Sequence, residues 1–216
     1  MTLKERIKSL IKEIDKFSPH PLFYSFVMTE GERKLFDTTV AGSKVYLEFG
    51  MGGSTFRVLL RSKAKVFSID SSLDWIDVMR QYFLIRSTEG KRLELIHVDI
   101  GNTREWGLPD GDSSKELFPS YSASIFDHVE SSTIDTVLVD GRFRVACTLK
   151  TIIECSENAD LKIMIHDFWR RTEYHIVLEY LDIVDRVDNL AVFKIKDDVD
   201  LDAVKENYNK YKYVHL

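Results

Sequence analysis

Apolar and polar residues follow a helical period at the start of the chain. The first apolar set has helical spacing with lysine and glutamate between its members: Leu3, Ile7, Leu10, Ile11, Ile14 and Phe17. This pattern predicts an amphipathic helix over residues 2–17. The SPHP segment at 18–21 ends it, because proline and the residue before it both resist helix. Thr29, with Glu32 three residues later, has the form of a capping box and predicts a second helix over 30–40.

Strand-like runs then alternate with helical segments. The runs cover residues 44–49, 65–70, 93–99, 135–140 and 162–167. Such alternation is typical of a parallel sheet with helices on both faces. Two further runs, 183–188 and 190–196, are separated only by Asn189. Because a parallel crossover needs about a dozen residues, these two runs predict an antiparallel hairpin. We predict a short helix over residues 199–209, after the hairpin.

Composition places the chain among single-domain globular proteins. Its 216 residues are 44% hydrophobic and 30% charged, which suits one domain over 1–216 with a full core. The net charge of −5 argues against a nucleic-acid partner. The N-terminus lacks the apolar core of a signal peptide, and no run reaches membrane-spanning length, so we expect no membrane. Cys147 and Cys155 lie in one predicted helix and are not expected to pair, which favours the cytoplasm.

One long stretch, residues 101–132, shows no regular period. Loops of this length in a compact domain are usually functional or disordered. This one carries Trp106, Phe118, Tyr121 and Phe126, too many aromatic residues for a disordered linker. We therefore expect an ordered lid over 101–132.

The segment LEFGMGGST, residues 47–55, joins the first strand to a helix that starts near Ser54. Its glycines let the backbone turn sharply and approach a ligand: Gly50, Gly52 and Gly53. The helix start offers free N–H groups to an anionic group. Asp70 ends the second strand twenty residues after Gly50, the spacing at which an acid meets ribose hydroxyls.

A dinucleotide dehydrogenase would share these features, but three observations oppose it. Thr55 stands where the third glycine of GxGxxG would fall, Glu48 puts a carboxylate at the end of the first strand, and the C-terminal hairpin is foreign to a simple dinucleotide fold. A negative charge at Glu48 would oppose a pyrophosphate and would suit a ligand with ammonium and sulfonium groups. The ligand indicated is S-adenosylmethionine.

At these motifs the chain resembles class I S-adenosylmethionine-dependent methyltransferases. LEFGMGGST resembles their first motif, FSIDSS their second, and HVDIG (97–101) their adenine-side segment. LVDGRFRVAC and IMIHDFWRRTEYHIV resemble a bacterial subgroup of methyltransferase-like proteins of largely unassigned substrate. The resemblance implies a Rossmann-like three-layer α/β/α sandwich, with a mostly parallel seven-stranded sheet and an antiparallel C-terminal hairpin. N-terminal helices would occupy 1–42, the catalytic core 43–196 and a C-terminal helix 197–216.

The resemblance also implies cofactor-binding roles for nine positions. The methionine portion would be lined by Gly50, Gly52, Gly53, Ser54 and Thr55. Glu48 would help to hold that end through water or backbone groups. Asp70 would accept hydrogen bonds from the ribose hydroxyls, and Asp99 with Ile100 would flank the adenine. For Glu48 the alternative is an acid that caps a local turn, for Asp70 a helix N-cap, and for Asp99 a loop acid.

Polar residues also follow the fourth and fifth strands. Asp140 ends the fourth, and His166 with Asp167 ends the fifth, so all three should face the cofactor crevice. Asp140 and Asp167 would suit Mg²⁺, which prefers oxygen ligands and would ready an acceptor hydroxyl. Alternatively, His166 is the general base. Arg142 and Arg144 would either bind an anionic substrate or pair with these acids.

The function predicted is methyl transfer from S-adenosylmethionine to a small-molecule acceptor, at oxygen, with Asp140, His166, Asp167 and Arg142 at the acceptor. Catalysis would rest on positioning and desolvation. The alternatives are a non-catalytic module that binds S-adenosylmethionine and, less favoured, a nicotinamide-dependent oxidoreductase. The sequence is also compatible with a homo-oligomer.

Overall fold

The computed structural model describes residues 3–104 and 107–215, and a seven-stranded sheet forms its centre. The strands are β1 (Val45–Phe49), β2 (Lys65–Asp70), β3 (Leu93–His97), β4 (Thr136–Val139), β5 (Lys162–Ile165), β6 (Leu181–Val187) and β7 (Leu190–Ile195). The α-helices are α1 (Leu3–Asp15), α2 (Glu30–Val40), α3 (Gly53–Arg61), α4 (Leu73–Arg80), α5 (Phe83–Thr88), α6 (Phe118–Ala123), α7 (Arg144–Cys155) and α8 (Leu201–Tyr211). The predicted helices at 2–17, 30–40 and 199–209 are present as α1, α2 and α8.

The strand order is β3-β2-β1-β4-β5-β7-β6. β1 to β5 pair in parallel, whereas β7 is antiparallel both to β5 and to β6. β6 therefore returns to the direction of the first five strands, and β7 alone is reversed. This is the mostly parallel seven-stranded sheet with a C-terminal hairpin that the sequence predicts, and the fold class is confirmed.

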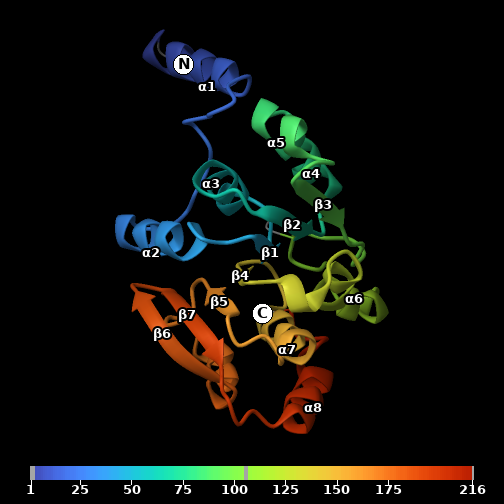
Figure 1. Cartoon of the computed structure of the whole chain (residues 1–216). Coiled ribbons are helices and arrows are strands. Elements are labelled where there is room, and N and C mark those ends of the chain that lie inside the picture. Colours follow the sequence, from blue (N-terminus) through green and yellow to red (C-terminus); the bar gives the residue numbers. More distant parts are fainter. Residues whose placement is uncertain (1–2, 105–106, 216) are drawn as a thin grey trace.

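Helices cover both faces of the sheet, so the chain has three layers (Figure 1). Two buried clusters result, one on each face. Beneath α2 to α5 the first contains, among others, Phe36, Tyr46, Val58, Ile76 and Leu138. Beneath α6 to α8 the second contains, among others, Leu47, Phe118, Leu149 and Phe193. Tyr46 and Leu47 are successive residues of β1 on opposite faces, as the two-residue period of a strand requires.

The stretch 101–132 is not irregular throughout. Its second half holds a 3₁₀ turn (Lys115–Leu117), α6 and two further 3₁₀ turns (Ser124–Asp127 and Ser131–Thr133). Phe118 and Tyr121 are buried in the core beneath α7, and Phe126 packs against the same cluster. Their aromatic character therefore reflects packing. Trp106 lies outside the described residues, and a lid function for 101–132 stays a prediction.

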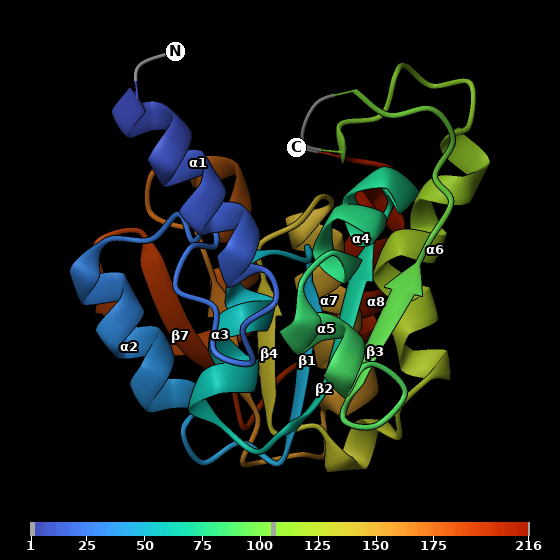
Figure 2. The same cartoon turned by 90° about the horizontal axis from the view of Figure 1, so that it is seen from above.

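The carboxyl ends of the parallel strands meet along one edge of the sheet (Figure 2). β1 lies between β2 and β4, so the chain leaves β1 in one direction along the sheet and returns to it from the other. Ligands in open α/β sheets bind at such a switch point. Gly50 follows β1, Asp70 ends β2, Asp140 follows β4 and His166 follows β5.

Two further findings bear on the sequence expectations. No helix among the described residues is long and apolar enough to cross a membrane. Cys147 and Cys155 are both buried and carry free thiols, as predicted.

The segment before α2 fixes the start of α3. A Cβ built on Gly53 would lie 2.1 Å from the carbonyl oxygen of Ser25 and 2.6 Å from the Cα of Phe26. Two backbones therefore approach so closely that only glycine fits at this position. Neighbouring Gly52 is different, because a Cβ there would meet no heavy atom within 4 Å.

We predict that Gly53→Ala lowers the free energy of unfolding by about 1–3 kcal/mol, because the added methyl group displaces backbone. Gly52→Ala is the matched control and should change it by less than about 0.5 kcal/mol. Urea denaturation of the two variants measures both values. Equal losses would show that the N-terminal segment does not hold α3.

Candidate cofactor and acceptor site

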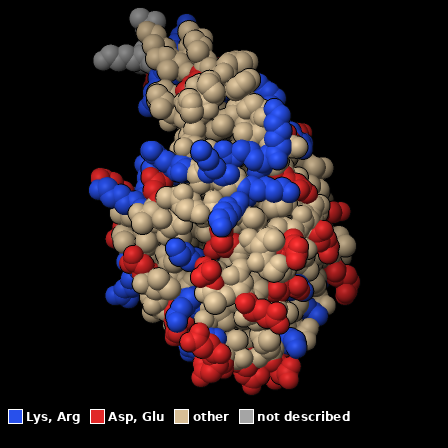
Figure 3. All heavy atoms as spheres, viewed as in Figure 1, with Lys and Arg blue, Asp and Glu red and all other residues tan. Residues whose placement is uncertain are grey.

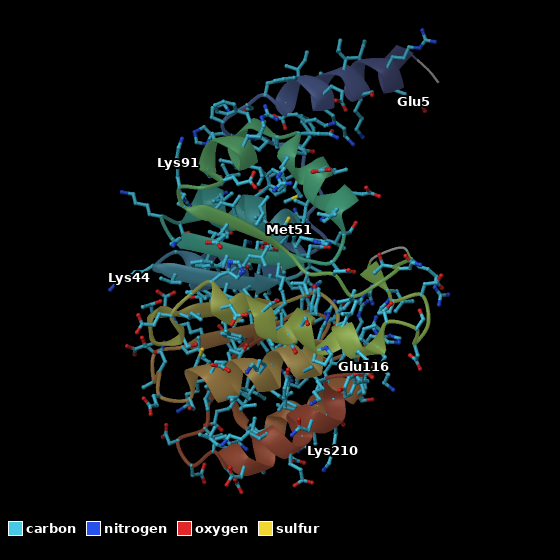
Figure 4. All side chains as sticks on the ribbon, turned by 90° about the vertical axis from the view of Figure 1, so that its right-hand side faces the viewer. Glu5, Lys44, Met51, Lys91, Glu116 and Lys210 are labelled. Carbon is cyan, nitrogen blue, oxygen red and sulfur yellow. The ribbon has the colours of Figure 1, made fainter. Side chains whose placement is uncertain are left out.

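The turn after β1 is built around three glycines with different surroundings. Gly50 has φ +96°, a left-handed conformation that favours glycine. A Cβ there would lie 2.6 Å from the Cα of Gly141, so the β1 and β4 loops touch at this point. The space beside Gly52 is open. On the outer side, the indole Nε1 of Trp75 donates to the carbonyl of Met51 at 2.9 Å. Figure 4 labels Met51 in this turn.

Glu48 lies beneath the turn and is completely buried. One carboxylate oxygen accepts hydrogen bonds from the hydroxyls of Tyr46 (3.1 Å) and Ser54 (2.7 Å). The other accepts from the hydroxyl of Ser68, at 2.6 Å, and from that of Thr55. Four hydroxyls from β1, β2 and α3 therefore surround this one carboxylate.

This arrangement gives Glu48 a structural role in the turn. Burial raises the pKa of its carboxyl group to about 7, although the four hydroxyl donors work in the opposite direction. Thr55 also accepts a hydrogen bond from the backbone N–H of Gly52 at 3.0 Å, so the network reaches the turn itself. The side chains of Ser54 and Thr55 donate to Glu48, so any contact of these residues with a ligand would fall to their backbone N–H groups at the start of α3. Of the two roles considered for Glu48, the geometry favours the acid that caps a local turn.

Asp70 joins the glycine turn to the end of β2. Its carboxylate accepts from the backbone N–H of Met51 at 3.3 Å and from that of Ser72 at 2.9 Å. The N-cap of α4 is Ser72, whose hydroxyl accepts from the N–H of Trp75. Asp70 is therefore not the N-cap itself. Burial raises the pKa of its carboxyl group.

The two residues predicted to border the adenine, Asp99 and Ile100, differ in their exposure to solvent. Asp99 is exposed, and its carboxylate accepts from the backbone N–H of Gly101 at 2.8 Å. This contact is the loop role considered for Asp99. Ile100 is buried in the main core cluster. Adenine contacts by Asp99 and Ile100 stay predictions.

The polar residues after β4 and β5 converge as predicted. Ligand-type atoms of Asp140, His166 and Asp167 all lie within 4.8 Å of one another. The Nδ1 atom of His166 lies 3.0 Å from Asp140 Oδ1, within hydrogen-bond distance. Asp167 has φ +58°, an uncommon conformation for a non-glycine residue.

Arg144 lies between the two aspartates. Its guanidinium is 3.1 Å from Asp140 Oδ1 and 3.5 Å from Asp167 Oδ2, and it also donates to the carbonyls of Gly141 and His166. Of the two roles considered for Arg144, pairing with the acids is the one observed. The guanidinium already supplies the positive charge between the carboxylates. As they stand, Asp140 and Asp167 therefore do not fit a magnesium site.

His166 also faces a second acid, which the sequence reasoning assigned only to a helix cap. Glu32 closes the capping box of α2 with Thr29, as predicted, yet its Oε2 lies 3.6 Å from Nε2 of His166. Its other oxygen accepts from the backbone N–H of Asn189 at 2.9 Å. Burial alone would lower the pKa of His166, but Asp140, Asp167 and Glu32 together raise it. General-base catalysis by His166 stays a prediction.

Two aromatic residues at this edge were not predicted as parts of the site. Tyr121 is buried, and its hydroxyl oxygen lies 2.3 Å from where a Cβ of Gly141 would stand. Trp75 contacts the glycine turn by its hydrogen bond to the carbonyl of Met51. Tyr121 was counted among the lid aromatics, and no sequence signal places it against the β4 loop. Arg142 is half-buried beside Gly141, and burial lowers the pKa of its guanidinium.

The residues of the turn fit the S-adenosylmethionine that the sequence indicates. Open space beside Gly52, backbone N–H groups at the start of α3 and a half-buried carboxylate at Asp70 offer room, donors and acceptors in one place. Two other surface hollows lie at the opposite edge of the sheet. One, of about 600 Å³, lies beside Tyr180 and Val199, and the other, of about 510 Å³, beside Ser43 and Leu60.

Comparisons with known proteins support this fold. A methyltransferase-like protein from Silicibacter pomeroyi has a similar structure, with a TM-score of 0.76 at 24% identity over 89% of this chain and 98% of that one. An rRNA methylase from Streptococcus thermophilus (12% identity, 80% and 100% covered) and a putative methyltransferase from Streptococcus mutans in complex with SAH (10%, 78% and 100%) both have TM-scores of 0.47. No protein-family model and no curated protein matches the chain. The chain therefore has a class I methyltransferase-like fold.

The raised pKa of Glu48 predicts a pH-dependent stability. The carboxyl group has an ordinary pKa of 4.5 and a folded-state pKa of about 7, so ionisation opposes folding as pH rises between these values. Relative to Glu48→Gln, the wild type should lose on the order of 3 kcal/mol between pH 4.5 and 8. Urea denaturation at each pH measures this difference, in which the contribution of His166 cancels. A difference that stays constant or grows with pH would contradict the assignment.

Arg144 should carry much of the stability of the acid cluster. Arg144→Met leaves Asp140 and Asp167 without their cation, and we expect a loss of about 3–5 kcal/mol in unfolding free energy. Arg170→Met is the matched control, because Arg170 is exposed and lies 3.8 Å from Asp167. Its loss should stay under about 1 kcal/mol. Equal losses in thermal or urea unfolding would reject a central role for Arg144.

Proposed function

We propose that this chain binds S-adenosylmethionine at the glycine turn and transfers its methyl group to an oxygen of a small-molecule acceptor. The observation that carries the proposal is the combination of a class I methyltransferase-like fold with open space at Gly52 and a half-buried acid at Asp70. Both residues lie at the switch point where ligands bind in such sheets.

In this proposal, backbone N–H groups bind one end of the cofactor and side chains bind the other. The N–H groups at the start of α3, with Gly52, receive the methionine end, while Glu48 keeps the turn in place from below. Asp70 accepts hydrogen bonds from the ribose hydroxyls, and Asp99 with Ile100 borders the adenine. The bound cofactor supplies an electrophilic methyl group on a sulfonium centre.

The acceptor side of the proposed site is formed by Asp140 and Arg142. His166 and Arg144 both contact the carboxylate of Asp140 and hold it in place, so it can orient an acceptor hydroxyl. His166 is then a positioning residue, as is Glu32 behind it. Because the displacement needs alignment more than proton transfer, fixed charges of this kind suit the reaction. We assign no step to a metal, since Arg144 bridges the carboxylates.

Calorimetry with S-adenosylhomocysteine tests the cofactor assignment. We expect binding in the micromolar range, roughly −8 kcal/mol. Asp70→Asn should weaken it by about 1–3 kcal/mol, because the acceptor for the ribose hydroxyls is impaired. Asp182→Asn, on the exposed edge strand β6, is the matched control and should leave affinity unchanged. Tight binding of NADH with none of S-adenosylhomocysteine would overturn the proposal in favour of an oxidoreductase.

A specific observation also supports the second candidate, a non-catalytic module that binds S-adenosylmethionine. The polar groups of the acid cluster bind mainly one another. Incubation with labelled S-adenosylmethionine and a panel of hydroxylated acceptors, with and without chelator, distinguishes a methyltransferase from a non-catalytic module. We expect chelator-insensitive methylation that Asp140→Asn reduces. Cofactor binding with no transfer to any acceptor would favour the module.

A further inference from the structure

The first helix presents an apolar face to solvent. Fifteen large apolar side chains are exposed among the described residues, and all but Leu117, Ile183 and Val184 come from two segments. The set on and after α1 is Ile7, Leu10, Ile11, Ile14, Phe17, Leu22, Phe23 and Val27. The set on α4 and α5 is Leu73, Trp75, Val78 and Phe83. We call these twelve residues the α1–α4 surface.

The two sets are neighbours in space. The backbone N–H of Phe83 donates to the carbonyl of Lys16 at 2.6 Å, and the hydroxyl of Tyr82 donates to the carbonyl of Phe23 at 3.2 Å. α1 itself projects past the helices it overlies, as its label Glu5 marks in Figure 4. In Figure 3 the top of the molecule, where Figure 1 places α1, shows mainly uncharged atoms above a band of lysine and arginine.

A thirteen-residue helix with its apolar face in water is marginally stable by itself. Leu10 and Ile14 are each 61% exposed, although they belong to the apolar stripe of an amphipathic helix. The whole surface exposes on the order of 1,000 Å² of apolar area, more than the largest patch of most monomers and similar to the ~800 Å² per partner of a standard interface.

We propose that the α1–α4 surface is the dimer interface of this protein, with α1 of each copy packed on α4 and α5 of the other. One molecule offers both halves of the contact, a ridge on α1 and a receiving face on α4 and α5, so a twofold axis lets each contact occur twice.

Charge supports this pairing. Helical spacing places Arg6 and Lys8 on either side of the apolar stripe of α1, with Glu13 and Asp15 farther along the same flanks. Asp74 and Asp77 lie among the apolar residues of α4, where Asp77 pairs with Arg80 at 3.3 Å. Basic flanks would meet acidic ones across the interface. An anionic membrane is disfavoured as the occupant, because the chain carries a net charge of −5 and the four basic residues of α1 are nearly balanced by three acidic ones. The interface would end near the cofactor site, since Trp75 donates to Met51.

Sedimentation equilibrium over a hundredfold range of concentration tests the proposal. We expect a mass of twice the 25.1 kDa of one chain. Leu10→Glu combined with Ile14→Glu should raise the dimer dissociation constant about 100-fold or more. Val184→Glu is the matched control, because Val184 is 53% exposed on β6, outside the surface. A wild-type monomer at every concentration, a dimer that survives the double variant, or equal dissociation in the control would overturn the proposal.

Charge reversal tests which elements meet. Arg6→Glu with Lys8→Glu should weaken the dimer, and so should Asp74→Lys with Asp77→Lys. The four changes together should restore it, because the attraction is re-formed with exchanged signs. Weakening without restoration would reject the α1-to-α4 contact. Binding to phosphatidylserine vesicles is measured as the last experiment. If a wild-type monomer binds these vesicles, the surface is a membrane-binding face and the dimer proposal is overturned.

Discussion

The site depends on one buried carboxylate. Glu48 is the fourth residue of β1, and the two-residue period of the strand directs it to the α3 face of the sheet, beside Tyr46. There its carboxylate accepts hydrogen bonds from hydroxyl groups of β1, β2 and α3. A buried charge is costly unless hydrogen bonds surround it, so the acid and its four donors must be kept together. That requirement fixes the start of α3 above the ends of two strands, and with it the glycine turn.

A second polar cluster fixes the other side of the crevice. Arg144 and His166 lie between the carboxylates of Asp140, Asp167 and Glu32, and these five residues come from α2, the β4 and β5 loops and α7. Opposite charges alternate through the cluster, so removing one leaves the others uncompensated. The same contacts hold the Asp140 carboxylate and the His166 ring in fixed positions at the carboxyl ends of β4 and β5.

The sequence predicts the fold well because the fold follows from period and turn chemistry. Strands, hairpin and the capping box of α2 are local patterns, and they survive in the structure. The direction of Glu48 was harder to predict, because the motif identifies an acid near the ligand without showing that four hydroxyls already surround it. Glu32 could not be linked to His166 at all, since 134 positions of chain separate them and only tertiary packing brings them together.

The same distinction explains the segment 101–132. Low periodicity and high aromatic content fit both a lid and a piece of core, and the sequence alone cannot separate them. Phe118 and Tyr121 of α6 are buried in the core cluster, so part of the segment belongs to the core. Tyr121 then reaches Gly141, where the β4 loop touches Gly50. The glycine turn is thus held from three directions: by Glu48 below, by Trp75 through Met51, and by Tyr121 across Gly141. A turn fixed so firmly presents its backbone N–H groups with little reorganisation, which is what binding a flexible, charged cofactor requires.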